Sequence, residues 1–168
     1  GYLGALPASH IDRFEAQQPV WAPLYCVHKT MAGLRDQYRY CGNTQALQIL
    51  EKMAAHFKQR MDRFNLQQLD AILERNEEGG ICEVLWDLYA LTGDANHRAV
   101  AEKLERRTFL DKLAAGEDCL TGRHGNSHIP LVLGAARRYE LTGDSTYLAM
   151  NTFFWDRVVT ARSFATGG

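Results

Sequence analysis

Apolar residues recur at steps of three and four along most of the chain, which is the spacing that puts side chains on one face of an α-helix. One continuous stripe runs from 44 to 64: Leu47, Leu50, Ala54, Phe57, Met61 and Phe64. The same spacing predicts helices over 80–92, 127–142 and 145–162. Their stripes are Ile81, Val84, Leu85, Leu88 and Leu91; Ile129, Val132, Leu133, Ala136 and Tyr139; and Leu148, Thr152, Trp155, Val159 and Arg162. Strand-like alternation is absent over any useful length, so the pattern predicts an all-α fold.

Three turns share one sequence pattern, in which Tyr stands four residues before Gly and Asn or Asp follows the Gly at once. They occupy 38–43, 89–94 and 139–144, and their glycines are 51 and 50 residues apart. Glycine just past a helix end can adopt the left-handed conformation that closes the last turn. The Asn or Asp after it can cap the next helix. Each unit therefore predicts a tight antiparallel helical hairpin, with the Tyr packed against the returning helix.

Repetition of a hairpin every fifty residues or so predicts stacked hairpins, as an open solenoid or a closed toroid. We expect six to eight helices and a single helical domain over 1–168. Residues 1–20 are expected to be extended or looped, and 116–128 to form a polar, glycine-rich link. Pro130 is then expected in the first turn of a helix, where its missing N–H does little harm.

Composition and charge argue against several partners. Hydrophobic residues make up 46% and charged residues 23%, which is ordinary for a globular protein. A formal net charge of −1 gives no electrostatic reason to expect nucleic acid or an anionic membrane. The pairs Arg106-Arg107 and Arg137-Arg138 are interpreted as solvated helix faces. No apolar run reaches the roughly 18 residues of a membrane helix, and residues 1–7 do not resemble a signal peptide. There is no initiator Met, so we expect the natural chain to start earlier.

The four cysteines are Cys26, Cys41, Cys82 and Cys119, and no two of them have Cys-x-x-Cys spacing. A structural zinc site therefore has no support from spacing. The first three cysteines fall within apolar helical patterns, which predicts buried free thiols and leaves the compartment open.

A few polar residues are placed oddly against the apolar pattern. His28 is one turn from Leu24 on a helix opened by Trp21-Ala22-Pro23, where a satisfied structural histidine is the simpler interpretation. Glu83 follows Gly79-Gly80 near a helix start, where the helix dipole favours a carboxylate. His124 and His128 are four apart, but the intervening Gly125-Asn126-Ser127 argues against one continuous helix and so against a two-histidine metal site.

Several motifs, in order and over essentially the whole chain, resemble glycoside hydrolase families 127 and 146, once catalogued as domain of unknown function 1680. The motifs are Gly1-Tyr2-Leu3-Gly4-Ala5, Trp21-Ala22-Pro23-x-Tyr25-x-x-His28-Lys29, Leu88-Tyr89-Ala90-Leu91-Thr92-Gly93-Asp94, His124-x-Asn126-x-His128-Ile129-Pro130, residues 135–144 and the closing Thr166-Gly167-Gly168. The resemblance implies part of an (α/α)₆ barrel, followed in full-length members by β-sandwich domains. It also implies removal of β-L-arabinofuranose with retention of configuration.

The resemblance further implies a cysteine thiolate nucleophile, held on zinc by one glutamate and three cysteines, with a second glutamate as acid and base. Coordination to zinc keeps such a sulfur deprotonated. The acid/base glutamate, the Glu-x-Cys zinc motif and the Cys-Cys pair are expected beyond Thr166-Gly167-Gly168, and none of the four cysteines is expected to match them. We therefore expect a fragment of about half a barrel, with no cofactor of its own and inactive alone.

What carries over from the family is one part of a sugar pocket. His28 and His124 are expected to contact sugar hydroxyls near one another, with Glu83, Asn126 and Trp21 as further contacts. Binding of L-arabinofuranose by half a pocket is expected to be weak.

The alternative is a helical-repeat module for protein interaction or self-association, without enzymatic activity. The segment 145–162 carries more apolar residues than one buried stripe needs: Phe153, Phe154, Trp155, Val158 and Val159. Exposed together, they would favour association. We therefore expect a homo-oligomer with this helix in the contact.

Overall fold

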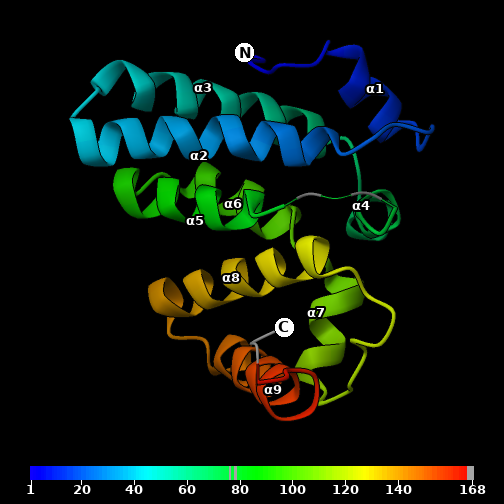
Figure 1. Ribbon diagram of the computed structural model, residues 1–168. Helices are drawn as coiled ribbons and strands as arrows, with labels where there is room; N and C mark the ends of the chain where they lie inside the picture. The colour runs from blue at the N-terminus through cyan, green and yellow to red at the C-terminus, as the bar shows by residue number, and fades with distance from the viewer. Residues whose placement is uncertain (76, 78, 166–168) are drawn as a thin grey trace.

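The computed structural model describes residues 1–75, 77 and 79–165 (Figure 1). These residues form nine helices and no strand, which confirms the all-α class. The helices are α1 (Ser9–Glu15), α2 (Pro23–Cys41), α3 (Thr44–Met61), α4 (Leu66–Leu73), α5 (Ile81–Thr92), α6 (Ala95–Lys103), α7 (Arg107–Ala114), α8 (Gly125–Thr142) and α9 (Ser145–Ala161). The expected six to eight helices were too few, and α1 lies in a stretch expected to be extended. Thr166-Gly167-Gly168 lies outside the described residues.

The three Gly-Asn/Asp turns are built as the sequence predicts. Each glycine follows the last residue of its helix with a positive φ: 66° at Gly42, 69° at Gly93 and 70° at Gly143. The next residue caps the following helix, because its side chain accepts a backbone N–H: Asn43 from Ala46, Asp94 from Asn96 and Asp144 from Thr146. Local chemistry alone therefore accounts for the α2–α3, α5–α6 and α8–α9 hairpins.

The hairpins stack so that α2, α5 and α8 run side by side with their N-termini at one end of the molecule (Figure 1). The helices α3, α6 and α9 each pack back against the helix that precedes them. The approach of α8 to α5 is close at Gly134, where a Cβ would lie 2.9 Å from the Cβ of Cys82. A larger residue there would push the two helices apart.

One buried carboxylate joins the three parallel helices. Asp87 of α5 is 6% exposed, and its two oxygens accept from Arg35 Nη1 of α2 and Arg137 Nε of α8, both at 2.7 Å. Charge-assisted hydrogen bonds of this length are strong, and they compensate the cost of burying the charge. The bridge holds α2, α5 and α8 in one register.

A second buried carboxylate, Glu105, connects the segment between α6 and α7 to α8 and α9. Arg138 Nη1 donates to both of its oxygens at 3.0 and 2.8 Å, and the Tyr147 hydroxyl donates at 3.1 Å. Burial still raises the pKa of Glu105, against the lowering effect of Arg138 and Arg107. This cluster lies between two apolar cores, one mainly from α1–α6 and one from α7–α9.

The expectation that both arginine pairs are solvated is wrong. Arg106 is fully buried, and Arg107 pairs with Glu105 at 3.0 Å. Arg137 pairs with Asp87, and Arg138 pairs with Glu105. Sequence could not reveal this for Arg137 and Arg138, because their buried acidic partners lie 50 and 33 residues away along the chain.

In α8 and α9, several residues of the predicted apolar stripes are exposed rather than buried. In α9 the buried residues are Tyr147, Met150 and Phe154, while Leu148, Trp155 and Val159 are exposed. In α8, Ile129 and Leu133 are exposed. Both helices have apolar residues on more than one side. The side of α9 that contacts α7, and the side of α8 that contacts α5, is the buried one.

Among the described helices, none is long and apolar enough to cross a membrane.

Two smaller expectations also fail. Cys41 is exposed at the last turn of α2, whereas Cys82 is buried and Cys26 half-buried. Pro130 lies in the second turn of α8 because the helix already begins at Gly125. The missing N–H of Pro130 removes the hydrogen bond that the carbonyl of Asn126 would otherwise accept.

The turn glycines give a test with a built-in control. We expect Gly93→Ala to lower the free energy of unfolding by about 1 kcal/mol, because its φ of 69° is strained for any residue with a Cβ. Gly33→Ala, inside α2 with no atom within 4 Å of the new Cβ, should raise it by about 0.5–1 kcal/mol. Urea denaturation measures both, and changes of the same sign would contradict the assignment.

The Asp87 bridge gives a second test. Asp87→Asn should lower the free energy of unfolding by about 3 kcal/mol, because two arginines lose their shared charge in a buried setting. Asp36→Asn removes a carboxylate that contacts Arg35 from an exposed position, and it should cost less than about 0.5 kcal/mol. Equal effects in urea denaturation would show that the bridge does not hold the helices together.

Candidate functional site

All five residues singled out in the sequence lie at the same end of the fold. Trp21 precedes α2 and His28 lies in its second turn, while Glu83 is in the first turn of α5. His124 is the N-cap residue of α8 and Asn126 is in its first turn. They share one end because the N-termini of α2, α5 and α8 do (Figure 1). The tertiary arrangement thus gathers residues from three separate parts of the chain.

His28 and Glu83 meet around the glycine pair before α5. The Gly80 N–H donates to His28 Nδ1 at 3.1 Å. A Cβ at Gly79 would lie 2.9 Å from Nδ1, and one at Gly80 would lie 3.0 Å from Nε2 and 3.4 Å from Glu83 Oε2. The imidazole therefore occupies the space that side chains at Gly79 and Gly80 would need. No side chain longer than glycine fits there without moving His28.

The histidine is held neutral. Burial lowers the pKa of His28 to about 4, and the positive charges of Lys29 and Arg35 act in the same direction. Because Nδ1 accepts from Gly80, the single proton of the neutral ring is on Nε2. His28 can therefore donate from Nε2 to a hydroxyl oxygen, and it sits beside the Glu83 carboxylate, which can accept.

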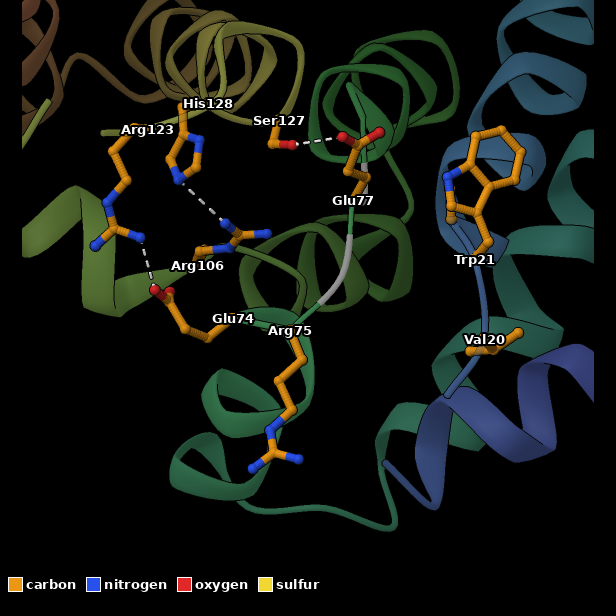
Figure 2. Close-up of a pocket in the computed structure, with 10 residues that line it drawn as sticks. Val20, Trp21, Glu74, Arg75, Glu77, Arg106, Arg123, Ser127 and His128 are labelled. Atoms are coloured by element: carbon orange, nitrogen blue, oxygen red, sulfur yellow. Dashed lines mark hydrogen bonds and ion pairs between the residues drawn. The ribbon is translucent and has the colours of Figure 1, made fainter. Parts of the chain in front are cut away.

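Glu77 is a residue that sequence reasoning missed. Its carbonyl accepts from the Tyr25 N–H at 3.1 Å, which fixes it to the start of α2. Its Oε1 accepts from the Ser127 hydroxyl at 2.9 Å (Figure 2). The same oxygen lies 3.5 Å from His124 Nε2, so Glu77 is fixed to the start of α8. The only signal in the sequence is that Glu77 lies two residues before the pair Gly79-Gly80, in a segment without helical periodicity.

A cavity of about 260 Å³ opens next to Glu77 (Figure 2). It is lined by Val20, Trp21, Ala22, Glu74, Arg75, Glu77, Arg106, Arg123, Ser127 and His128. Arg123 Nη1 pairs with Glu74 at 2.7 Å, and Arg106 Nη2 donates to the Leu73 carbonyl at 2.9 Å. Trp21, 78% exposed, leaves its indole open to solvent at this cavity. Trp21 is also the one sequence-predicted residue among those that line it.

His28 and His124 contact neighbouring residues before α5 rather than each other. Within the described residues, no hydrogen bond joins the two imidazoles. Each contacts a described residue that precedes α5: His28 accepts from Gly80, and His124 lies 3.5 Å from Glu77. Asn126 is exposed in the first turn of α8, as is His124 just before it.

The argument from Gly125-Asn126-Ser127 against a helix is wrong. Residues 125–128 are the first turn of α8, and His128 Nδ1 lies 2.9 Å from the carbonyl of His124. The ring of His128 instead packs edge-on against Phe109 at 4.8 Å between centroids. Across the part of the chain that the structure describes, no three His, Cys, Asp or Glu side chains are grouped as metal ligands.

The cysteines do not fit the zinc set that the resemblance implies. Cys26 and Cys41 are fifteen residues apart on one helix, hence about 22 Å. Cys82 Sγ donates to the Leu104 carbonyl at 3.1 Å, inside the core.

Glu-x-Cys spacing occurs once in this chain, at Glu117-Asp118-Cys119. It lies in the α7–α8 link. Glu117 is 3.5 Å from Lys112 Nζ, and Asp118 accepts from both Nη atoms of Arg162 at 2.8 and 2.9 Å. Burial raises the pKa of Cys119, which disfavours the thiolate that zinc requires.

The stack of helical hairpins is consistent with the helical-barrel fold that the resemblance implies. The whole chain, residues 1–168, matches the family described as β-L-arabinofuranosidase, GH127 catalytic domain. The chain therefore belongs to this family, as the motifs in the sequence indicate. A comparison with curated proteins gave no match.

The pKa of His28 predicts a pH dependence of stability. It is about 4 in the folded chain against about 6.5 when unfolded, so protonation between these values favours unfolding. The contribution of neutral His28 to the free energy of unfolding is complete above pH 6.5 and is lost as the pH falls to 4. His28→Asn keeps an acceptor for the Gly80 N–H but does not titrate, so its unfolding midpoint should fall less than wild type over this interval.

The same substitution at His10, away from this site, should keep the wild-type decline. Urea midpoints at pH 7, 5.5 and 4.5 compare the three proteins. A parallel decline in His28→Asn and wild type would show that His28 is not held neutral by the fold.

Proposed function

We propose that this chain forms one side of the sugar pocket in a β-L-arabinofuranosidase-type glycoside hydrolase barrel. The pocket contacts would be His28, His124, Glu83, Asn126 and Trp21. The observation that supports the proposal is their convergence on one end of three parallel helices, in a chain that belongs to this family. Gly80 contacts His28, and Glu77 contacts Ser127 and His124, so the residues before α5 link two of the five groups.

Each group has chemistry suited to a sugar. Neutral His28 donates a hydrogen bond from Nε2, and the Glu83 carboxylate accepts from a hydroxyl. Asn126 offers a donor and an acceptor in one amide, and His124 stands exposed beside it. Trp21 presents a flat apolar surface, of the kind against which the C–H face of a sugar ring packs.

We propose that this part of the barrel does not carry out hydrolysis alone. In this proposal, Cys26, Cys41, Cys82 and Cys119 are neither the family's nucleophile nor its zinc ligands. Without a nucleophile and an acid/base pair, the covalent route of a retaining glycosidase is closed. Turnover of an aryl β-L-arabinofuranoside should stay at the buffer rate, and the purified protein should contain no stoichiometric zinc.

Binding is tested by NMR titration with L-arabinose and with methyl β-L-arabinofuranoside, whose ring is locked as a furanose. Few contacts imply a dissociation constant in the millimolar range or weaker. Shifts should be concentrated at the five proposed residues, and D-arabinose should produce smaller ones because its hydroxyls are arranged as the mirror image. Shifts confined to residues far from His28 and His124 would contradict the proposal.

Trp21→Ala and Tyr40→Ala make a matched pair for the same titration. Both aromatic side chains are largely exposed, but Tyr40 lies at the opposite end of α2. Trp21→Ala should weaken binding several-fold, which matches a loss of roughly 1 kcal/mol, whereas Tyr40→Ala should leave it unchanged.

The alternative function is a helical-repeat module for association. It is favoured by one observation, the apolar surface on α8 and α9, where Ile129, Leu133 and Trp155 are exposed. The two functions are compatible, because this surface and the candidate site are lined by different residues.

A further inference from the structure

The guanidinium of Arg35 reaches both a structural carboxylate and a residue of the candidate site. Arg35 lies on α2, seven residues after His28 and therefore on the same side of the helix. Its Nη1 donates to Asp87 Oδ2 at 2.7 Å and lies 3.8 Å from Glu83 Oε1. Glu83 and Asp87 are one turn apart on α5. Arg35 therefore stands between the bridge that joins the helices and the helix ends that carry the site.

The position of this guanidinium is fixed from two sides. Nε of Arg35 donates to Asp36 at 2.9 Å, while Asp87 holds Nη1. The side chain of Arg35 is 16% exposed and that of Asp87 is 8% exposed, so dissolved salt screens this charge less than it would on the surface. A fixed cation is thus presented to Glu83.

The two oxygens of Glu83 have different neighbours. Oε1 is the oxygen near Arg35. Oε2 lies 3.4 Å from the place of a Cβ on Gly80, and Nε2 of His28 lies 3.0 Å from the same point. Within the described residues, Arg35 is the only cation at ion-pair distance from Glu83. Without it, this half-buried carboxylate would be better hydrated if it turned away from His28 toward solvent.

We propose that Arg35 is a positioning residue of the sugar pocket, whose guanidinium holds the Glu83 carboxylate beside His28. The inference rests on the proposed function, because Glu83 and His28 are two of its five contacts. The same cation disfavours protonation of the His28 ring, and it does so together with Lys29, which contacts the Tyr25 ring rather than Glu83. One arginine thus maintains an acceptor and a neutral donor at the same place.

Arg35→Gln and Arg137→Gln make a matched pair, because each removes one 2.7 Å bond to Asp87. Among the described residues, Arg137 makes no ion pair with Glu83. NMR titration of the His28 imidazole, assigned by the loss of its signal in His28→Asn, gives the protonated fraction at pH 4.5. Arg35→Gln should raise the pKa of His28 by about 0.5 and so about double that fraction. Arg137→Gln should leave the fraction unchanged.

Sugar affinity is the second readout. The Kd for methyl β-L-arabinofuranoside should rise about three-fold or more in Arg35→Gln and stay unchanged in Arg137→Gln, because only the first change loosens Glu83. Arg35→Lys keeps the positive charge and should return the protonated fraction of His28 to the wild-type value.

Circular dichroism checks that each variant is folded. Should Arg35→Gln fold poorly, Arg35→Met combined with Asp87→Leu replaces the buried pair by apolar side chains, a change that proteins often tolerate. The same rise in the protonated fraction of His28 is expected in that double variant.

A purely structural role of Arg35 predicts equal effects in the two glutamine variants, and that result would overturn the proposal. Wild-type values of both readouts in Arg35→Gln would overturn it as well. A doubled protonated fraction in Arg35→Gln, with no sugar binding by the wild type, would instead contradict the proposed function while supporting the action of Arg35 on His28.

Discussion

The carboxylate of Asp87 is the interaction on which the arrangement of this molecule depends. It belongs to α5 and bonds at the same time to Arg35 of α2 and Arg137 of α8. Burying a charge is costly unless it is paired and hydrogen-bonded, so the carboxylate tolerates burial only while both arginines stay in place. That condition fixes how far each helix can slide along its neighbours. The register it sets brings the N-termini of α2, α5 and α8 to a common end.

The candidate site depends on that register and on two glycines. Gly79 and Gly80 leave room for the imidazole of His28 against the backbone before α5. The contact removes His28 from water, keeps its ring neutral and assigns its proton to Nε2. Glu77, two residues earlier, extends the same segment to Ser127 and His124. A short connection between helices thus sets both the proton state of one predicted sugar contact and the position of another.

The side of the hairpin stack is buried at α5 and exposed at α8 and α9. Where α8 lies against α5, Cys82 and Trp86 are buried and Arg138 lies over the indole. On the side of α8 and α9 that no other described helix covers, Ile129, Leu133 and Trp155 are exposed. The difference arises from neighbours rather than from composition, since both surfaces are apolar. The exposed apolar residues of α8 and α9 and the polar residues at the helix N-termini therefore lie on different parts of one stack.

The sequence by itself determined the helical class, the three hairpin turns and their caps, because these depend on residues within one or two turns of each other. It also indicated His28, Glu83, His124, Asn126 and Trp21, through motifs. Only the tertiary structure decided that Arg106 is buried, that Asp87 joins three helices and that Glu77 connects two of them. It also selected the buried sides of α8 and α9. These outcomes depend on partners 33 to 52 residues distant along the chain, and apolar periodicity carries no information about which neighbour a helix will meet.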